Sequence, residues 1–369
     1  MFGDLFKEKK VIVTGNSGFK GSWLSIWLKK LGASVHGISY LAPSYPNMFE
    51  SLSLENKLDS FYKVDISENA PKLNDIITNI KPDFLFHLAA QPLVSVSYQK
   101  PLETLYTNVL GTANVLNSIR KQDRRIVSVI ITSDKCYDNL ELERGYHEDD
   151  DLGGKDIYSG SKGAAELVIK SFFHSYFKNH KHNSVLATAR AGNVIGGGDW
   201  GKDRIVPDAI TSWSKRNVLH IRNPISTRPW QHVLEPLSGY LSLAYRLNSD
   251  RSLNGESFNF GPDKSSNKTV KELIQGLSKR WGFKEEDSFF IKPTEEFHEA
   301  GLLQLDCKKA NEILDWFPNL SFQEMINFSS DWYKEFYLNN DIENMLLNTE
   351  NQIDEYEKLA INKNYFWTM

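Results

Sequence analysis

A phenol and an amine stand four residues apart in the segment Tyr158-Ser159-Gly160-Ser161-Lys162, which opens a helix-length stretch. Residues four apart lie on one face of a helix, so Tyr158 and Lys162 are expected to act at the same site. A cation beside a phenol favours the phenolate and lowers the phenol's pKa from about 10. The pair is therefore predicted to serve as a general base.

A second cluster, Thr132-Ser133-Asp134-Lys135-Cys136-Tyr137, ends a β-branched run that is typical of a strand. Ser133, Asp134 and Lys135 bring a hydroxyl, a carboxylic acid and an amine together. By themselves they could form an ordinary polar turn. Beside a tyrosine base, however, an additional acid and base indicate proton abstraction with expulsion of water, which simple dehydrogenation does not need.

Glycines at positions 15, 18 and 21 follow a strand-like run, Lys10 to Thr14, and precede an apolar helix-length stretch. The first glycine permits a tight turn, and the others remove a Cβ where a phosphate must come close to the helix N-terminus. This spacing and context predict a dinucleotide site, with Gly15, Gly18 and Gly21 at its turn. A bound nicotinamide cation would add to the effect of Lys162 on the pKa of Tyr158.

The acidic residue that usually holds the adenosine ribose is missing from this pattern. The second strand ends Ile38-Ser39-Tyr40-Leu41, with no carboxylate before Glu50 and no Arg or Lys. A carboxylate at this position would favour NAD and a basic residue would favour NADP, so the residues present here do not distinguish the two cofactors. Asp65, followed by Ile66, ends a short apolar run and could accept the adenine amino group; a helix cap or loop carboxylate is the alternative.

Strands that alternate with helices must position these groups. Strand-like runs occupy 10–14, 34–40, 84–88, 126–132 and 185–190, and helix-length segments occupy 70–80, 102–120 and 158–177. This rhythm predicts an α/β fold of Rossmann type, a doubly wound parallel sheet with helices on both faces. Beyond about Gly192 the chain is rich in Gly, Pro, Trp and Arg, and 257–260 looks like a return to the sheet. The last segment, 340–369, is polar, and its docking is not predicted.

Composition excludes several classes of protein. The 369 residues carry 43 Lys and Arg against 47 Asp and Glu, a net charge of −4 that does not favour nucleic acid binding. Two cysteines exclude a disulfide framework, and no apolar run approaches the roughly 18 residues of a membrane span. The N-terminus lacks an apolar signal segment, so a cytoplasmic location without membrane attachment is expected.

Taken together, these motifs resemble the extended short-chain dehydrogenase/reductase superfamily and, within it, the nucleotide-sugar 4,6-dehydratases. The nearest resemblance is to the group that acts on CDP-glucose. The similar segments span nearly the whole chain: 14–24 (TGNSGFKGSWL), 87–94 (HLAAQPLV), 132–137 (TSDKCY), 158–162, 190–200 (RAGNVIGGGDW) and 228–237 (RPWQHVLEPL). Dehydratases for dTDP-glucose and GDP-mannose typically carry a Thr-Asp-Glu triplet where this chain has Ser133-Asp134-Lys135.

The resemblance implies a redox-neutral elimination with bound NAD as cofactor and CDP-4-keto-6-deoxyglucose as product. Tyr158 would take the proton from the 4-hydroxyl, with Ser133 sharing its hydrogen bond and Lys162 holding the nicotinamide ribose. Lys135 would remove the proton on carbon 5, and Asp134 would protonate the departing 6-hydroxyl. Lys135 can do this only if its ammonium loses a proton, which burial or neighbouring positive charge would favour.

The resemblance also assigns binding residues and domains. It adds to the glycines a set of cofactor contacts: Asn16, Ser17, Phe19, Leu88, Ala89, Ala90 and Thr107. Its candidates for substrate contacts are Gln91, Asn193, Arg204, Arg222 and Arg228. Residues 1–191 would form the NAD-binding domain, with a returning segment near 233–262, and 192–369 would mainly bind the nucleotide sugar. Paired helices 102–120 and 158–177 would make a homodimer or a dimer of dimers.

Three further features have two interpretations each. Trp200 and Trp230 could stack on the base, although packing is favoured. His87 is expected to be structural, because the nine histidines show no metal-site spacing, so no metal is expected. Cys136 is expected to be a packing residue rather than a nucleophile. A dehydratase or epimerase for another nucleotide sugar remains the alternative function, although an epimerase does not need the triplet.

Overall fold

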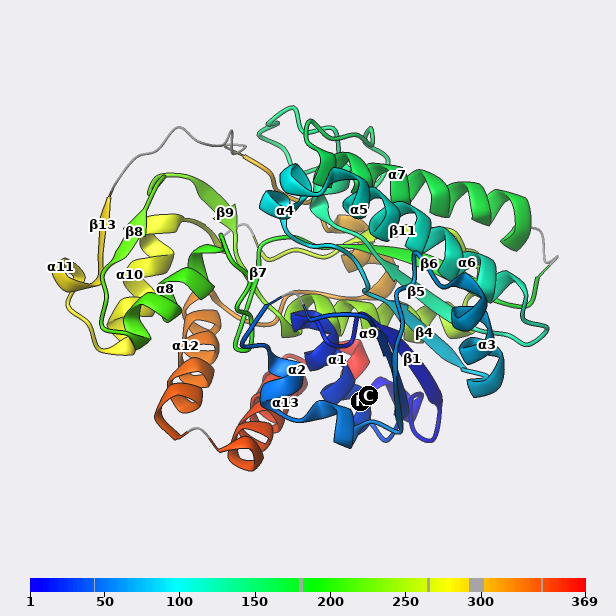
Figure 1. Cartoon of the computed structure of the whole chain (residues 1–369), viewed down its shortest axis with the longest axis horizontal. Coiled ribbons are helices and arrows are strands. Elements are labelled where there is room, and N and C mark those ends of the chain that lie inside the picture. Colours follow the sequence, from blue (N-terminus) through cyan, green and yellow to red (C-terminus); the bar gives the residue numbers. More distant parts are fainter. Residues whose placement is uncertain (43, 179–181, 264–265, 292–301, 340) are drawn as a thin grey trace.

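A parallel sheet forms the centre of the computed structural model, which describes residues 1–42, 44–178, 182–263, 266–291, 302–339 and 341–369 (Figure 1). Among these residues the sheet has seven strands in the order β11-β6-β5-β4-β1-β2-β3, and each neighbouring pair is parallel. The strands are β1 (Lys10–Thr14), β2 (Ser34–Ser39), β3 (Ser60–Lys63), β4 (Phe84–His87), β5 (Val127–Ile131), β6 (Val185–Arg190) and β11 (Ser257–Asn259). The predicted doubly wound α/β fold is confirmed.

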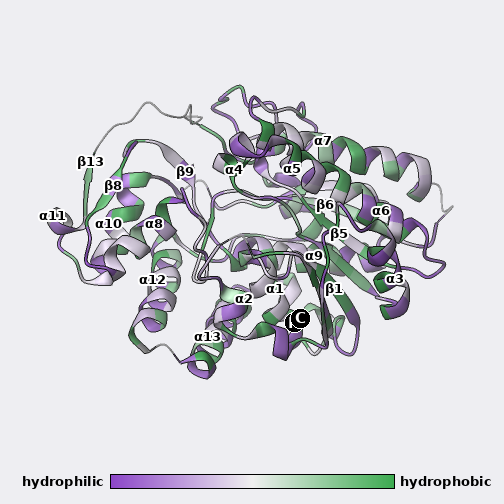
Figure 2. Ribbon diagram, viewed as in Figure 1, coloured by the Kyte–Doolittle hydropathy of each residue, from purple (hydrophilic) through white to green (hydrophobic). Residues whose placement is uncertain are grey.

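Helices cover both faces of this sheet because its central strands are apolar on both sides. On one face, Ile12, Leu85 and Ile130 pack under α3 (Ala70–Ile80), α6 (Thr112–Arg120) and α7 (Ile157–Phe172). On the other face, Val13 and Val129 pack on α1 (Phe19–Lys30) and α9 (Leu234–Ser249). Figure 2 shows these strands in the green of hydrophobic residues.

The strand order reverses at β1, whose carboxyl end therefore borders a crevice. The chain continues from β1 outward to β2 and β3, and then returns to β4 on the other side of β1. Thr14 and His87, the last residues of β1 and β4, are paired in register. Ligands of such sheets bind at this position, so the predicted glycine turn after Thr14 is placed correctly for a dinucleotide.

A second lobe follows β6 and lies at the left of Figure 1. It contains small sheets beside helices, rather than strands of the central sheet. Its elements are α8 (Ile205–Ser214), β8 (Leu219–Ile221) parallel to β13 (Phe289–Ile291), β9 (Thr227–Pro229) antiparallel to β12 (Asn267–Thr269), α10 (Val270–Trp281), α11 (Glu285–Ser288) and α12 (Phe322–Asn339).

The end of the chain returns to the first lobe. Helix α13 (Ile342–Asn362) packs on α1, and the backbone N–H of Gly3 donates to the carbonyl of Met369 at 2.7 Å. The rings of Phe2 and Trp367 stack with centroids 5.2 Å apart. The described part of the final segment is thus a helix with an aromatic anchor under the sheet.

Element boundaries differ from the predictions mainly at helices near the site. The predicted helix 102–120 is α5 (Pro101–Leu105), a π-helical turn (Tyr106–Gly111) and α6, and α7 ends in another π-helical turn (Phe173–Phe177). Strand β3 was not predicted.

No helix within the described ranges is long and apolar enough to cross a membrane. Shorter elements are η1 (Phe2–Asp4), α2 (Met48–Ser51), η2 (Leu54–Lys57), α4 (Val94–Gln99), η4 (Asp134–Cys136), β7 (Val194–Ile195) paired with β10 (Gln231–His232), η6 (Arg251–Leu253), η8 (Ala310–Leu314) and η9 (Phe366–Thr368).

Candidate active site

The glycine turn lies between β1 and α1 as predicted. Gly15 has a φ of +75°, and a Cβ added there would lie 2.6 Å from the backbone nitrogen of Ala89. A Cβ on Gly21 would lie 2.2 Å from the carbonyl oxygen of Gly15. Gly18 is the N-cap of α1 and has no side chain to occupy the helix N-terminus. The turn is therefore closed to larger residues and leaves backbone N–H groups facing the crevice.

Serines at the end of β2 support this turn where many dinucleotide sites have a carboxylate. The N–H of Ser17 donates to Ser39 Oγ at 3.2 Å, and Ser17 Oγ donates to the carbonyl of Leu41 at 3.3 Å. Asn16 departs from its predicted role, because its fully buried side chain lies beneath Gly37 and it does not line the cavity. Its amide has no hydrogen-bond partner among the described residues.

The triplet after β5 forms a compact turn. Ser133 Oγ accepts from the N–H of Lys135 at 3.2 Å and donates to Asp134 Oδ1 at 2.8 Å. The Asp134 side chain is buried and lies against Gly192, where an added Cβ would be 2.0 Å from Oδ2. Lys135 is half-buried. All three line the same cavity, so the acid and the amine predicted for elimination face one space.

Tyr158 and Lys162 lie on the first turns of α7, which Asp156 caps by accepting from the N–H of Ser159 at 2.9 Å. Lys162 Nζ is 6.0 Å from the centre of the Tyr158 ring. Burial lowers the pKa of Lys162 to about 8. Burial, with a smaller contribution from Asp134, raises the pKa of Tyr158 to about 12, although the Ser133 hydroxyl lowers it. Among the protein groups burial therefore dominates the pKa of Tyr158, and its lowering by Lys162 together with a nicotinamide cation stays a prediction.

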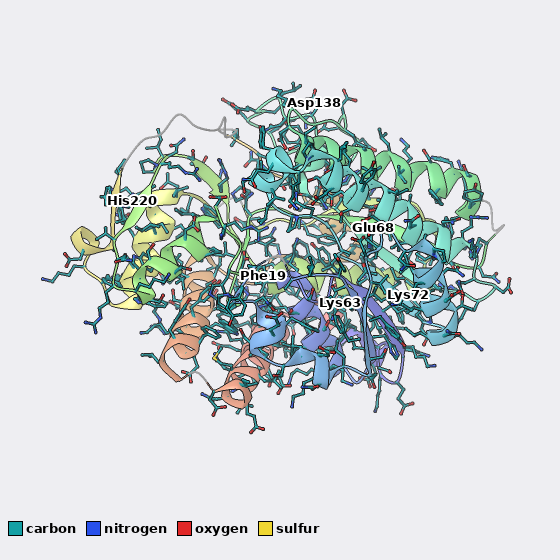
Figure 3. All side chains as sticks on the ribbon, in the orientation of Figure 1. Phe19, Lys63, Glu68, Lys72, Asp138 and His220 are labelled. Carbon is teal, nitrogen blue, oxygen red and sulfur yellow. The ribbon has the colours of Figure 1, made fainter. Side chains whose placement is uncertain are left out.

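One cavity of about 1130 Å³ joins the two lobes at the carboxyl ends of the strands. Figure 3 labels Phe19 from the glycine turn and His220 from the second lobe, and both line it. Except for Asn16, every predicted site residue lines this cavity: Gly15, Ser17, Gly18, Phe19, Gly21, Asp65, Ile66, Leu88, Ala89, Ala90, Gln91, Thr107, Ser133, Asp134, Lys135, Tyr158, Lys162, Asn193, Arg204, Arg222 and Arg228.

Several of these residues already have partners within the chain. Asp65 Oδ1 accepts from both the N–H and the hydroxyl of Ser67, at 2.8 and 2.6 Å. This oxygen therefore makes the local hydrogen bonds that are expected of a loop carboxylate. The amide of Gln91 bonds to Leu93 and Thr104, which holds its own loop together. Because Asp65 Oδ1 and the side-chain amide of Gln91 already make these hydrogen bonds, they have less capacity to bind a ligand.

The arginines enter the cavity from the second lobe. Arg204 Nη1 forms an ion pair with Asp199 at 2.9 Å, and Asp199 raises the pKa of Arg204. Arg228 is buried and donates to the carbonyl of Thr227 at 2.9 Å, whereas Arg222 is exposed at the rim. Asn193 has a left-handed φ of +53°. A cationic rim of this kind suits an anionic ligand.

His87 and Cys136 have the buried surroundings of structural residues. His87 is buried between Thr14 Oγ1, at 2.7 Å, and Thr112 Oγ1, at 3.1 Å, and burial lowers its pKa to about 3. Burial raises the pKa of Cys136, which makes a thiolate unfavourable. Trp200 does not line the cavity, although Trp230 does. No group of three His, Cys, Asp or Glu within the described residues is placed to hold a metal ion.

Among the titratable groups of the cavity wall that sequence reasoning missed, Lys20 and Asp208 have clearly shifted pKa values. Lys20, between Phe19 and Gly21, donates to Tyr240 Oη at 3.4 Å, and burial with Lys162 and Arg204 lowers its pKa to about 8. Burial raises the pKa of Asp208, on α8, to about 6. The only signal for Lys20 was a charged residue inside the glycine motif, and Asp208 had none.

Comparison with known proteins assigns the class. Residues 12–328 match the family described as GDP-mannose 4,6 dehydratase, and the chain belongs to this family. The chain is 43% identical over 356 residues to a CDP-glucose 4,6-dehydratase of Salmonella typhimurium, covering 96% of this chain and 97% of that protein. It is 23% identical to a UDP-glucose 4-epimerase of Mycoplasma pneumoniae, over 89% of this chain and 98% of that protein.

Solved structures share the fold. A dTDP-glucose 4,6-dehydratase of Bacillus anthracis, crystallised with NAD, superposes with a TM-score of 0.74 at 20% identity, covering 89% of this chain and 97% of that chain. A UDP-glucose 4-epimerase of Thermotoga maritima, solved with UDP-glucose, gives 0.75 at 21% identity, covering 88% and 99%. The predicted membership of the extended dehydratase and epimerase group is confirmed.

Proposed function

We propose that the chain is an NAD-dependent CDP-glucose 4,6-dehydratase, a hydro-lyase that forms CDP-4-keto-6-deoxyglucose. The observation that carries this proposal is the convergence of Tyr158, Lys162, Ser133, Asp134 and Lys135 on one cavity. The relative of 43% identity supports CDP-glucose as the substrate. A hydroxyl base and a separate acid and amine are the groups that an oxidation followed by elimination needs.

The residues present fit NAD. A Cβ on Gly15 or Gly21 would collide with neighbouring backbone, so only glycine permits this tight turn at the N-terminus of α1, where a diphosphate would bind. Bound NAD would supply the acceptor for the hydride from carbon 4 and return that hydride to carbon 6. Lys162 would hold the nicotinamide ribose, and the turn with Ser17, Phe19 and Leu88 to Ala90 would hold the rest.

Tyr158 begins the reaction by accepting the proton of the sugar's 4-hydroxyl. Its pKa of about 12 must fall in the complex, and two cations act in that direction: Lys162 and the nicotinamide ring. The Ser133 hydroxyl lowers the pKa of Tyr158, and it would stabilise the phenolate by turning its hydrogen from Asp134 Oδ1 to the tyrosine oxygen. Loss of this proton, together with loss of the carbon 4 hydride to the acceptor that NAD would supply, would leave a ketone at carbon 4, which acidifies the hydrogen on carbon 5.

Asp134 and Lys135 then complete the elimination. Lys135, as the free amine, takes the carbon 5 proton, and Asp134, as the neutral acid, protonates the 6-hydroxyl as it leaves as water. The Ser133 hydroxyl, 2.8 Å from Asp134 Oδ1, links the acid to the tyrosine site. Both groups lie on one short turn, so they can act on adjacent carbons of one sugar.

The second lobe, with residues 192–369 as its main part, would bind the nucleotide. Arg222, Arg228 and Asn193 are our candidates for the diphosphate, and Arg204, whose guanidinium forms an ion pair with Asp199, is a further one. The first lobe would be residues 1–191 with the returning segment 233–262, which includes α9 and β11.

Assembly into a homodimer, or a dimer of dimers, is part of the proposal. Tyr98, Leu102, Tyr106 and Leu110 follow one another at four-residue spacing, and each is 45% or more exposed. Leu167 on α7 is 55% exposed nearby in the fold, and α5 packs on α7. An apolar stripe of this kind favours burial against a second copy. The enzyme would work in the cytoplasm, in deoxysugar synthesis for an O-antigen type polysaccharide.

The deciding experiment incubates the protein and NAD with CDP-glucose, dTDP-glucose or GDP-mannose in deuterated water and follows product mass. We expect loss of one water and gain of one solvent deuterium from CDP-glucose alone. The same change from another nucleotide sugar would keep the mechanism and replace the substrate. Recovery of a 4-epimer without water loss, or steady release of reduced cofactor, would contradict the dehydratase assignment.

A further inference from the structure

A buried ion pair lies directly behind the catalytic wall of the cavity. Arg190, the last residue of β6, donates from Nε to Glu166 Oε1 at 2.8 Å and from Nη2 to Oε2 at 2.9 Å. Both side chains are 3% exposed, and neither residue lines the cavity. Glu166 lies one helical turn beyond Lys162 on α7, so Tyr158, Lys162 and Glu166 share a helix face.

This pair holds the start of the catalytic turn. Thr132, which directly precedes Ser133, donates from Oγ1 to Glu166 Oε1 at 2.5 Å. Glu166 thereby connects the helix of the tyrosine base to the residue next to the triplet. With two bonds from Arg190 and one from Thr132, the carboxylate accepts three hydrogen bonds, which compensates for its burial.

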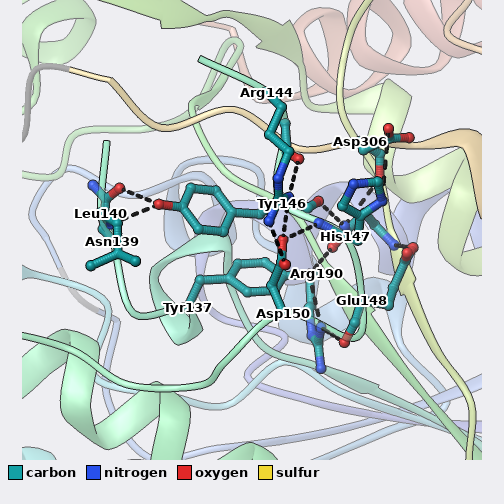
Figure 4. A network of polar contacts seen from close by, with 12 residues as sticks. Tyr137, Asn139, Leu140, Arg144, Tyr146, His147, Glu148, Asp150, Arg190 and Asp306 are labelled. Atoms are coloured by element: carbon teal, nitrogen blue, oxygen red, sulfur yellow. Dashed lines mark hydrogen bonds and ion pairs between the residues drawn. The ribbon is translucent and has the colours of Figure 1, made fainter. Parts of the chain in front are cut away.

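The same pair holds the end of the turn. Arg190 Nη1 donates to Tyr137 Oη at 2.8 Å and to the carbonyl of Glu148 at 3.0 Å, and its guanidinium lies 5.0 Å from the centre of the Tyr137 ring. Tyr137 Oη donates in turn to Asn259 at the end of β11, at 2.8 Å. Figure 4 shows Arg190 beside Tyr137 within this network.

We infer that Glu166 and Arg190 are positioning residues for the elimination, a role that rests on the proposed function. They hold the turn of Ser133, Asp134 and Lys135 at both ends and tie it to the helix of Tyr158 and Lys162. Hydride removal depends mainly on Tyr158 and Lys162 of α7 and on the glycine turn, with Ser133 as the one contact from the triplet, whereas water loss depends on where Asp134 and Lys135 stand relative to the same sugar. Loosening the network therefore slows water loss more than oxidation at carbon 4. Buried ion pairs can fix one arrangement in this way even when they add little stability.

The test compares two tyrosines of one segment. Tyr137→Phe removes the hydroxyl that joins the turn to Arg190 and leaves the ion pair intact. Tyr146→Phe is the matched control, because its ring stacks on Tyr137 at 5.2 Å and is equally buried, while among the described residues its hydroxyl bonds only to Leu140 and Asn139. In single turnovers with CDP-glucose we expect Tyr137→Phe to slow water loss about tenfold, with oxidation at carbon 4 and KM changed less than twofold. Tyr146→Phe should change each less than twofold.

A conservative pair probes the guanidinium itself. Arg190→Lys keeps the charge and loses the forked geometry, so it should retain more of the water-loss rate than Arg190→Met. If Arg190→Met does not fold, Tyr137→Phe decides. Equal loss of both chemical steps in Tyr137→Phe, or an equal effect of Tyr146→Phe, would overturn the positioning role and leave a structural one.

Hydrogen exchange gives a readout without catalysis. Backbone amides of 132–137 should exchange at least threefold faster in Tyr137→Phe than in Tyr146→Phe, with α7 unchanged. If the unmodified protein does not convert CDP-glucose, the proposed function fails and this comparison alone decides the positioning role. Unchanged exchange in 132–137 would overturn it.

Discussion

The carboxylate of Asp134 rests on the α-carbon of Gly192, so closely that a Cβ there would lie 2.0 Å from Oδ2. The loop after β6 thereby sets the position of the acid that follows β5. No larger residue fits at 192 without displacing Asp134.

Gly192→Ala should therefore damage the elimination selectively. We expect a fall of about 10²-fold in water loss, because a misplaced acid loses most of its contribution, while oxidation at carbon 4 falls much less. The measurement is the product mass assay in deuterated water, with rapid quenching. Gly160→Ala on α7 is the control, since the nearest atom to its added Cβ is 4.0 Å away; a similar loss there would refute the explanation.

Lys135→Ala should separate the two stages of the reaction. Without the amine, the carbon 5 proton has no base, so the 4-keto sugar and reduced nicotinamide should accumulate within the first turnover. Absorbance of the reduced nicotinamide and product mass report this directly. Normal production of the 6-deoxy sugar would remove Lys135 from the mechanism and direct attention to Lys20, which also lines the cavity.

Tyr158→Phe should block the first stage. Removing a general base typically costs about 10²–10⁴-fold in rate, and here neither oxidation nor water loss should proceed at more than that residual level. Because Tyr158 lines the cavity and the substitution keeps its ring, the melting temperature should change little. Tyr62→Phe on β3 serves as the control, and an unaffected rate in Tyr158→Phe would exclude the base role.

Glu235 should make stability depend on pH. This buried carboxyl on α9 accepts from the N–H groups of Asn319 and Leu320 and from the hydroxyl of Tyr356, yet burial raises its pKa to about 7. The folded chain thus binds this proton more tightly than the unfolded chain, whose value is near 4.5. The contribution of this proton to the free energy of unfolding is complete below about pH 4.5 and is lost as the pH rises through about 7, by about 3 kcal/mol at most.

Denaturant unfolding from pH 5 to pH 8 checks this sign. Glu235→Gln cannot titrate, so the difference in unfolding free energy between variant and parent should change steadily in favour of the variant as the pH rises. A difference that is constant across this range would show that Glu235 titrates near its ordinary value.

Local patterns in the sequence were enough for the parts of the fold that local physics controls. The predicted bounds of β1, β6 and α3 match the structure, because buried β-branched runs and a helical period are readable without neighbours. The glycine spacing and the Tyr158 and Lys162 pair are also short-range features, and each lies where its motif predicts. Strand β3 was missed because this four-residue edge strand is only partly buried and shows no clear alternation.

Only tertiary structure decided how side chains from distant segments meet. Gly37 on β2 lacks a Cβ and so leaves room for the buried Asn16 side chain, Glu166 and Arg190 meet from elements whose sequences give no sign of a partner, and α13 docks on α1. The sequence by itself determined which chemical groups the chain carries and which short segments present them. Burial raises the pKa of Tyr158 and lowers that of Lys162. The burial of each side chain depends on every segment that packs around it, so it cannot be predicted from a short sequence motif.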